Sequence, residues 1–228
     1  MVTGGTRGIG RAIAERLLRE GASVAVCSRS HENVQAFVRD CKDADGRVYG
    51  EVADVSKLED VQRFCHSVEA RFGGLDILIN NAGIGIFKSV ADLSPEEWRR
   101  TIDLNLTGVY FCCHEVLQRM RNRGGGYIIN ISSLAGKNVF AGGAAYNASK
   151  FGLNGFSEAM MMDHRYDNVR VSYIMPGSVD TTGFRRQEGA AAWKIQPEDV
   201  AEVVMMLLGM PARTLISRVE IRPSRPPK

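Results

Sequence analysis

Residues 3–10 read Thr3-Gly4-Gly5-Thr6-Arg7-Gly8-Ile9-Gly10, and the rest of the chain is best understood from this stretch. It follows a short apolar run at Met1–Thr3 and precedes Arg11–Glu20, where Ile13 and Leu17 share one face of an expected helix. Glycines permit positive φ angles and let the backbone approach a pyrophosphate, while a helix N-terminus offers unpaired N–H groups. The stretch therefore predicts a dinucleotide-binding turn, with contacts from Gly4, Thr6, Arg7, Gly8, Ile9 and Gly10.

Short β-branched apolar runs alternate with longer segments of helical period along the whole chain. Strands separated by helices pair in parallel and are covered by helices on both faces. We therefore expect an α/β fold: one Rossmann-fold domain over residues 1–228, with a doubly wound parallel sheet of about seven strands. The expected strands are Met1–Thr3, Ser23–Ser28, Arg47–Val52, Leu75–Asn80, Tyr127–Ile131, Arg170–Met175 and Arg218–Ile221. The expected helices are Arg11–Glu20, Lys57–Phe72, a helix opening at Ser94, Thr107–Arg121, Ala145–His164 and Pro197–Leu208.

Several residues mark where these helices begin and end. Gly21 is expected to terminate the first helix, and Ser56 to cap the helix at Lys57–Phe72. Ser94-Pro95-Glu96-Glu97 combines a cap, a first-turn proline and acids near the positive end of the helix dipole. Almost no residues precede Thr3 in the first strand, so we also expect native residues ahead of Met1.

Composition excludes several classes of protein. The 228 residues are 44% hydrophobic with a formal net charge of +3, and no basic stripe with interleaved aromatics suggests nucleic acid. No apolar run is long enough to span a bilayer. The five cysteines show no CxxC spacing and the histidines share no ligand spacing, so no metal site is expected. We expect a cytoplasmic protein.

Five further motifs follow the glycine turn: Asn80-Asn81-Ala82-Gly83, Asn105, Ser133, Tyr146-x-x-x-Lys150 and Pro176-Gly177. With the TGxxxGxG spacing of the turn, they resemble the short-chain dehydrogenase/reductase (SDR) family over nearly the whole chain, in that family's order. The resemblance implies an NAD(P)-dependent oxidoreductase acting on CH–OH donors, which interconverts a ketone and a secondary alcohol. Within the family, the chain is similar above all to bacterial 3-oxoacyl-acyl-carrier-protein reductases.

The second strand ends at Cys27-Ser28-Arg29, without the acidic residue that selects NAD in dinucleotide folds. Arg29, helped by Arg7, offers a cationic fork suited to a 2′-phosphate. NADP(H) is therefore expected as the cofactor rather than NAD. The resemblance adds further cofactor contacts at Ser28, Asp54, Val55, Asn81, Ala82, Gly83, Pro176, Gly177, Val179 and Thr181.

Tyr146 and Lys150 lie four residues apart and project from one helix face. Reduction of a ketone needs a proton donor, and we expect the Lys150 ammonium to lower the pKa of the Tyr146 phenol. The resemblance makes both residues cofactor contacts as well as catalytic residues. It implies that Ser133 holds the substrate oxygen and that Asn105 steadies a water linked to Lys150. The alternative for Asn105 is a helix-kink or capping amide.

Walls of the substrate pocket are expected beyond the carboxyl ends of the strands. The expected wall residues are Ile86, Phe87, Leu134, Val139, Phe140, Met175 and the stretch from Gly183 to Lys194 with Phe184 and Trp193.

The expected partner is a small carbonyl or alcohol compound, with no nucleic acid and no membrane. Tyr166-Asp167-Asn168 replace a basic residue that carrier-protein reductases usually present, which argues against an acyl carrier protein, although Arg121 and Arg123 could compensate. General carbonyl or alcohol reduction stays open, as do a sugar-nucleotide epimerase or dehydratase and a non-catalytic NADP-binding sensor.

The resemblance also implies a homodimer or homotetramer. The family's contact uses the helices expected at Thr107–Arg121 and Ala145–His164. On the first of these helices it could be supplied by Val109, Cys113, Val116, Leu117 and Met120.

Overall fold

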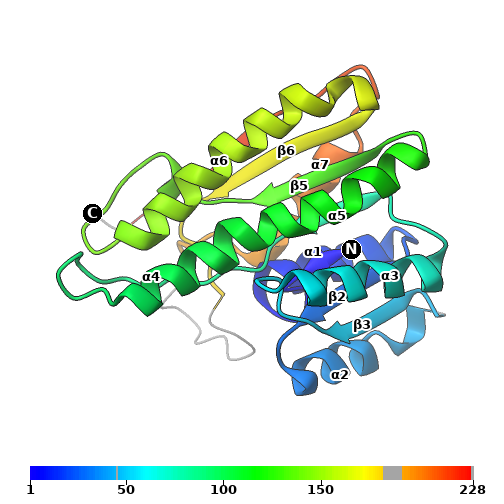
Figure 1. Ribbon diagram of the computed structural model, residues 1–228, viewed down its shortest axis with the longest axis horizontal. Coiled ribbons are helices and arrows are strands. Elements are labelled where there is room, and N and C mark those ends of the chain that lie inside the picture. Colours follow the sequence, from blue (N-terminus) through cyan, green and yellow to red (C-terminus); the bar gives the residue numbers. More distant parts are fainter. Residues whose placement is uncertain (45, 182–191, 227–228) are drawn as a thin grey trace.

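The computed structural model describes residues 1–44, 46–181 and 192–226, and its strands form one parallel sheet (Figure 1). The order in the sheet is β3-β2-β1-β4-β5-β6-β7, and every neighbouring pair is parallel. The order reverses between β1 and β4, so a crevice opens at the carboxyl ends of these two strands. The strands are β1 Val2–Thr3, β2 Val24–Ser28, β3 Val48–Val52, β4 Ile77–Asn80, β5 Gly126–Ile131, β6 Val169–Pro176 and β7 Arg218–Ile221.

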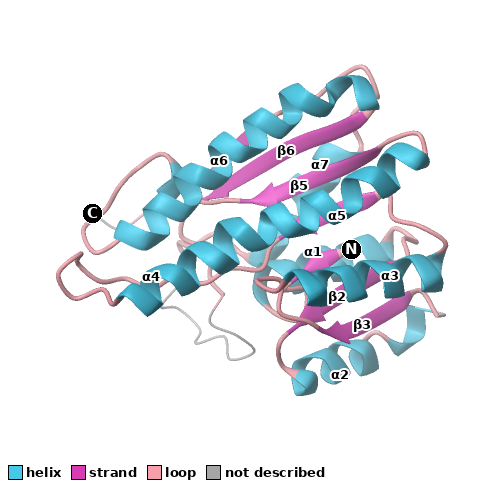
Figure 2. Ribbon diagram, in the orientation of Figure 1, coloured by secondary structure: helices cyan, strands magenta, loops and turns pink. Residues whose placement is uncertain are grey.

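Helices cover both faces of the sheet, as Figure 2 shows. Buried side chains of α3, α5 and α6 pack on one face with Leu78 and Ile128 of the sheet. Buried side chains of α1, α2 and α7 pack on the other face with Ile79 and Ile129, the next residue along each strand. This alternation follows from the two-residue period of a strand. The helices are α1 Gly8–Arg19, α2 His31–Asp40, α3 Leu58–Phe72, α4 Pro95–Ile102, α5 Gly108–Asn122, α6 Ala144–His164 and α7 Pro197–Leu208.

The sequence analysis predicted the fold class, the seven strands and six of these helices. It missed α2, which Ser30 caps by accepting a hydrogen bond from the backbone of Asn33. Only Val34 and Phe37 of this helix are buried, so its apolar stripe is too narrow to be recognised as a helical period. It also missed the π-helical turn Asp103–Thr107, which joins α4 to α5.

Helix-end signals were mostly interpreted correctly. Gly21 has φ +87° and follows the end of α1, and Ser94 with Glu97 forms a reciprocal capping box at α4. The prediction for Ser56 is wrong, because its hydroxyl donates to the Asp54 carboxylate and does not cap α3.

The expected contact residues of α5 are also misplaced. Val109, Cys113, Val116 and Met120 are buried in this chain's own core, and Leu117 packs against the same cluster. They face the sheet because their spacing matches the buried stripe of α5, whereas Tyr110 is 46% exposed on the outer side. Among the described residues, no helix combines the length and apolarity needed to cross a bilayer.

Candidate active site

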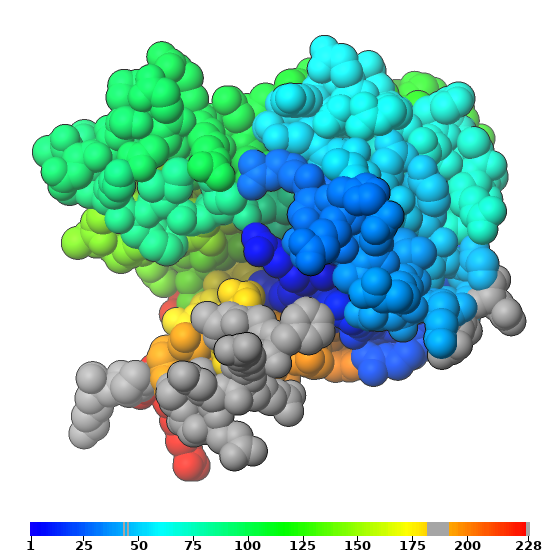
Figure 3. Space-filling view, turned by 90° about the horizontal axis from the view of Figure 1, so that it is seen from below, coloured from blue at the N-terminus to red at the C-terminus, as the bar shows by residue number. Residues whose placement is uncertain are grey.

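A crevice of about 570 Å³ opens at the carboxyl ends of β1 and β4. In Figure 3 the surface is recessed where the blue N-terminal segment meets the green segment. Most of the expected site residues line this crevice, and they come from stretches far apart in sequence. They are Gly4, Thr6, Arg7, Gly8, Ile9, Ser28, Arg29, Asp54, Val55, Asn81, Ala82, Gly83, Tyr146, Lys150 and Thr181.

The glycine turn forms the floor of the crevice. Gly4 and Gly8 have φ angles of +61° and +54°, a conformation that other residues rarely adopt. A Cβ atom on Gly4 would lie 3.0 Å from the Ala82 Cα, so the turn packs closely against the segment after β4. The helix N-terminus at Gly8 opens into the same crevice, and α1 has no acidic residue in its first turn. This bare, positively polarised cradle fits a pyrophosphate.

Gly10 does not line the crevice, but it allows α1 to pack closely against the end of β4. A Cβ atom there would clash with the Asn81 amide and the Gly4 carbonyl, so α1 could not approach the end of β4. The same closeness of helix and strand is the reason for the last glycine of dinucleotide-binding turns.

Asn81 and Thr3 join the ends of β4 and β1. The Asn81 amide donates to the carbonyls of Thr3 and Gly4, with a donor–acceptor distance of 3.0 Å in each bond. The Thr3 hydroxyl accepts from the backbone N–H groups of Asn81 and Ala82 at 3.0 and 3.1 Å. These bonds tie the end of β4 to the end of β1 at the centre of the sheet.

One end of the crevice is exposed and basic. Arg29 lines it just after β2, where no carboxylate is present, and Arg7 lines it from the glycine turn. Both guanidinium side chains are exposed. Arg29 also lines an adjoining cleft of about 400 Å³ together with Asp54. This end offers cationic forks where a 2′-phosphate would need them.

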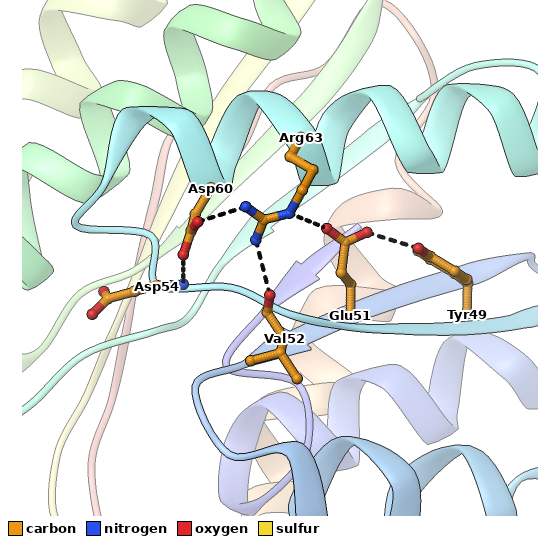
Figure 4. A network of polar contacts seen from close by, with 6 residues as sticks. All are labelled: Tyr49, Glu51, Val52, Asp54, Asp60 and Arg63. Atoms are coloured by element: carbon orange, nitrogen blue, oxygen red, sulfur yellow. Dashed lines mark hydrogen bonds and ion pairs between the residues drawn. The ribbon is translucent and has the colours of Figure 1, made fainter.

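A network of charged groups holds the loop that follows β3 at this exposed end (Figure 4). The Asp60 carboxylate accepts from the backbone N–H of Asp54 at 2.9 Å, and this bond, with Arg63, lowers the pKa of Asp60. Arg63 pairs with Asp60 at 2.7 Å and with Glu51 at 3.0 Å, and it donates to the Val52 carbonyl at 3.1 Å. The network thereby ties α3 to the loop that carries Asp54.

The other end of the crevice is buried and is formed by α6 and the end of β5. Tyr146 and Lys150 both reach the crevice from one face of α6. The Lys150 ammonium donates to the Ile131 carbonyl at 2.9 Å and lies 5.9 Å from the centroid of the Tyr146 ring. Ser133, just after β5, lowers the pKa of the Tyr146 phenol, and its hydroxyl accepts from the backbone N–H of Ala135 at 3.1 Å. Ser132, and not Ser133, is among the residues that line the crevice, and its hydroxyl donates to Asn154.

Burial is the largest cause of the pKa shifts of Tyr146 and Lys150. It raises the pKa of the Tyr146 phenol, although Ser133 acts in the opposite direction. It lowers the pKa of Lys150 to about 8. The expectation that Lys150 lowers the pKa of the phenol is therefore wrong for this structure, because the loss of hydration of the phenolate outweighs any attraction to the ammonium.

Asn105 is fully buried in the π-helical turn and does not line the crevice. Its amide exchanges two 2.8 Å hydrogen bonds with the backbone of Ile84 and donates to Ser149 at 3.1 Å. Ser149 in turn donates to the Tyr146 carbonyl at 2.8 Å. These contacts match the helix-kink alternative, and the water-holding role stays a prediction.

The segment after β6 is only partly in the crevice. Thr181 lines it beside Gly8, whereas Gly177 donates from its backbone to the Ile221 carbonyl at 2.8 Å and packs against Leu134. Pro176 ends β6, and Val179 bridges Ile195. Pro176, Gly177 and Val179 therefore lie at or just after the carboxyl end of β6 and are not among the residues that line the crevice.

Of the expected substrate walls that the structure describes, Phe87 alone lines the crevice. Its ring stacks edge-on against Tyr146 and Phe140. Met175 is buried and accepts a contact from Asn154, so it belongs to the core. Phe184 and most of residues 183–194 fall outside the described part of the chain.

Seven lining residues were missed by sequence reasoning. All are small or apolar and lie within two residues of one that was identified, so position near a motif was the available signal. They are Cys27, Ala53, Ile84, Gly85, Leu104, Ile131 and Ser132.

Comparison with known proteins identifies the family. The family described as short chain dehydrogenase matches residues 1–192. A 3beta-hydroxysteroid dehydrogenase of Mediterraneibacter gnavus is 38% identical over 182 residues, which are 79% of this chain and 66% of that protein.

Two solved structures are also similar over nearly the full chain. A metagenomic short-chain oxidoreductase in complex with NADP is 39% identical with a TM-score of 0.85, covering 98% of this chain and 96% of that one. A 3-ketoacyl-ACP reductase from Sinorhizobium meliloti is 29% identical with a TM-score of 0.87, covering 96% of this chain and 95% of that one.

Proposed function

The chain belongs to the short chain dehydrogenase family, and from this premise we propose that it interconverts a ketone and a secondary alcohol with NADP(H). The observation that carries the proposal is the meeting, in one crevice, of an anion cradle at the glycine turn and the Tyr146–Lys150 pair. A cofactor extended along the crevice would place its reactive ring beside the phenol. The similar metagenomic oxidoreductase is in complex with NADP, which supports the choice of cofactor.

The bound nicotinamide supplies or accepts the hydride. In the reducing direction, Tyr146 donates its phenolic proton to the ketone oxygen as negative charge builds there. Ser133, which lowers the pKa of the phenol, is proposed to share that charge through its hydroxyl. The phenol regains a proton from solvent after the alcohol leaves.

The direction of the pKa shift bears on the working direction. Because burial raises the pKa of Tyr146, the phenol stays protonated at neutral pH. A protonated phenol is the form needed to reduce a ketone, whereas oxidation of an alcohol needs the phenolate. Oxidation of an alcohol by the same site should therefore need a higher pH than reduction of a ketone.

Lys150 is proposed to orient the cofactor's ribose through its ammonium, held in place by the Ile131 carbonyl. Arg29 and Arg7 are proposed to bind the 2′-phosphate at the exposed end. The absence of an acid at the end of β2 favours NADP(H) over NAD(H), since a carboxylate there would repel the phosphate.

Reduction of a 3-oxoacyl thioester is a second candidate, supported by the similarity to the Sinorhizobium meliloti enzyme. Against docking of an acidic carrier protein, Arg121 pairs with Asp167 at 3.3 Å and Arg123 with Asp76 at 3.1 Å. These two charges are already matched within the chain. A small carbonyl compound is therefore the favoured substrate.

The test is NADPH oxidation, followed by absorbance, with a panel of small ketones and a 3-oxoacyl thioester. We expect turnover of at least one small ketone, with NADPH preferred to NADH. Tight NADPH binding without turnover of any compound would instead support the sensor alternative.

A further inference from the structure

Two phenylalanine rings form a row of contacts that runs from the Tyr146 ring to the protein surface. The Phe87 ring meets the Tyr146 ring edge-on, with centroids 5.4 Å apart and planes at 83°. The Phe140 ring meets Phe87 at 5.5 Å and 66°. Yet Phe87 is 61% exposed and Phe140 is 44% exposed, so neither ring is consumed by core packing. Contiguous exposed apolar surface at the mouth of a site commonly marks where a ligand binds.

The backbone is built to accommodate the two rings. A Cβ atom on Gly85 would lie 2.5 Å from the Phe87 ring, and one on Gly143 would lie 2.9 Å from the Phe140 ring. Larger residues at either glycine would push the rings out of place. The glycines thus leave room for the rings on the two loops.

The two loops are also fixed to one another and to α6. An isolated parallel bridge joins Lys88 to Gly143, beside the two rings in sequence. Asn147, the neighbour of Tyr146, donates to the carbonyls of Ala135 and Asn138 at 2.7 and 3.2 Å. The rings are therefore positioned relative to the phenol before any substrate arrives, which lowers the entropic cost of binding.

Charges around the rings are matched within the chain. Lys88 pairs with Glu97 at 2.6 Å, and Lys137, on the loop with Phe140, pairs with Glu220 at 2.6 Å. Neither ammonium is left to recognise an anionic substrate group. On this side of the crevice, the groups left to contact a substrate are therefore the aromatic rings.

We propose that Phe87, backed by the Phe140 ring, forms a subsite for an aromatic group attached to the substrate's carbonyl carbon. The inference rests on the proposed function, since it places the carbonyl at Tyr146. An aromatic group would pack against the Phe87 ring while the carbonyl oxygen reaches the phenol. Ring pairs prefer offset or edge-on contacts, and Phe87 already makes two of the latter.

The test compares two methyl ketones with the same number of carbons, acetophenone and cyclohexyl methyl ketone, by kcat/KM with NADPH. We expect the wild-type protein to favour acetophenone by about 10-fold. Phe87→Leu keeps an apolar side chain but removes the ring, so the preference should fall to within about 2-fold. Val90→Ala, a change of another exposed residue on the same loop, should leave the preference unchanged.

A second readout measures binding of 1-phenylethanol and 1-cyclohexylethanol to the NADP⁺-loaded protein by calorimetry. The aromatic alcohol should bind more tightly to wild type, and Phe87→Leu should lose that difference. Equal affinities in wild type, or a preference that survives in Phe87→Leu, would overturn the subsite. Failure of wild type to reduce either ketone would instead count against the proposed function, and the calorimetry would still decide the subsite.

Discussion

The two ends of the crevice are built by opposite means. At the end formed by α6, Lys150 is only 6% exposed and its ammonium donates to the Ile131 carbonyl. At the exposed end, where the cofactor's adenosine is proposed to bind (the adenosine end), Arg7 and Arg29 offer charge to solvent. Buried polar groups are costly and act strongly, whereas exposed charges are screened and act weakly. Chemistry should therefore depend on the first end and cofactor choice on the second.

The largest effect should come from the phenol. Tyr146→Phe removes the proton donor and keeps the ring, so kcat for ketone reduction should fall about 1000-fold while the NADPH dissociation constant barely changes. Steady-state kinetics and fluorescence titration measure the two quantities. Tyr127→Phe is the matched control, since that buried phenol bonds Ser172 within the sheet, and it should keep wild-type turnover. Turnover by Tyr146→Phe close to wild type would remove the assigned role.

Lys150→Met should separate function from stability. Loss of the ammonium should lower kcat about 100-fold. The ammonium nevertheless costs stability, since burial lowers its pKa to about 8 from 10.5.

The unfolded chain then binds more protons than the folded chain between those two pKa values. The free energy of unfolding contributed by Lys150 should therefore rise with pH, by about 3 kcal/mol in all. Below pH 8 the destabilisation is fully present. Denaturant titrations of the cofactor-free protein at several pH values should show this rise in wild type and in Lys57→Met. The same slope in Lys150→Met would contradict the assignment.

A smaller effect is expected at the exposed end. Arg29→Ala should weaken NADPH binding about 10-fold and leave NADH binding nearly unchanged, because only NADPH carries the 2′-phosphate. The effect should shrink as salt is added, since the guanidinium is exposed. Arg39→Ala is the control, because Arg39 is an exposed arginine on α2 that does not line the crevice. Equal losses for the two cofactors would exclude Arg29 as the selecting residue.

The smallest effect should follow disruption of the network in Figure 4. Arg63→Ala removes a half-exposed guanidinium that supports Asp60, which in turn holds the Asp54 backbone. NADPH affinity should fall about 2-fold, and stability should change little because the exposed ion pairs are screened by solvent. Arg71→Ala, on the same helix but bonded to the Gly46 carbonyl, should leave the affinity unchanged. A loss as large as that of Arg29→Ala would mean that this network, and not exposed charge, governs the adenosine end.

The comparison also explains what could be predicted from sequence. The alternation of strands with helices, the glycine turn and the Tyr146–Lys150 spacing are local patterns, so the doubly wound parallel sheet and the cofactor-binding turn could be predicted from them. The acidity of Tyr146 did not, because it depends on how much water the folded chain removes from the phenol. Nor did the partners of Asn105, which lie about 20 residues earlier at Ile84 and 44 later at Ser149. Burial and long-range bonding are properties of packing and leave little trace in local patterns.

The central claim is that this crevice brings a bound nicotinamide to a carbonyl held at Tyr146. The most direct test is to mix the wild-type protein with a reducible ketone and NADPH deuterated at the transferable position, and to analyse the alcohol by mass spectrometry. The account predicts one deuterium on the carbinol carbon of every alcohol molecule formed. Alcohol formed without the label, or no alcohol at all from a protein saturated with NADPH and any ketone tested, would contradict it.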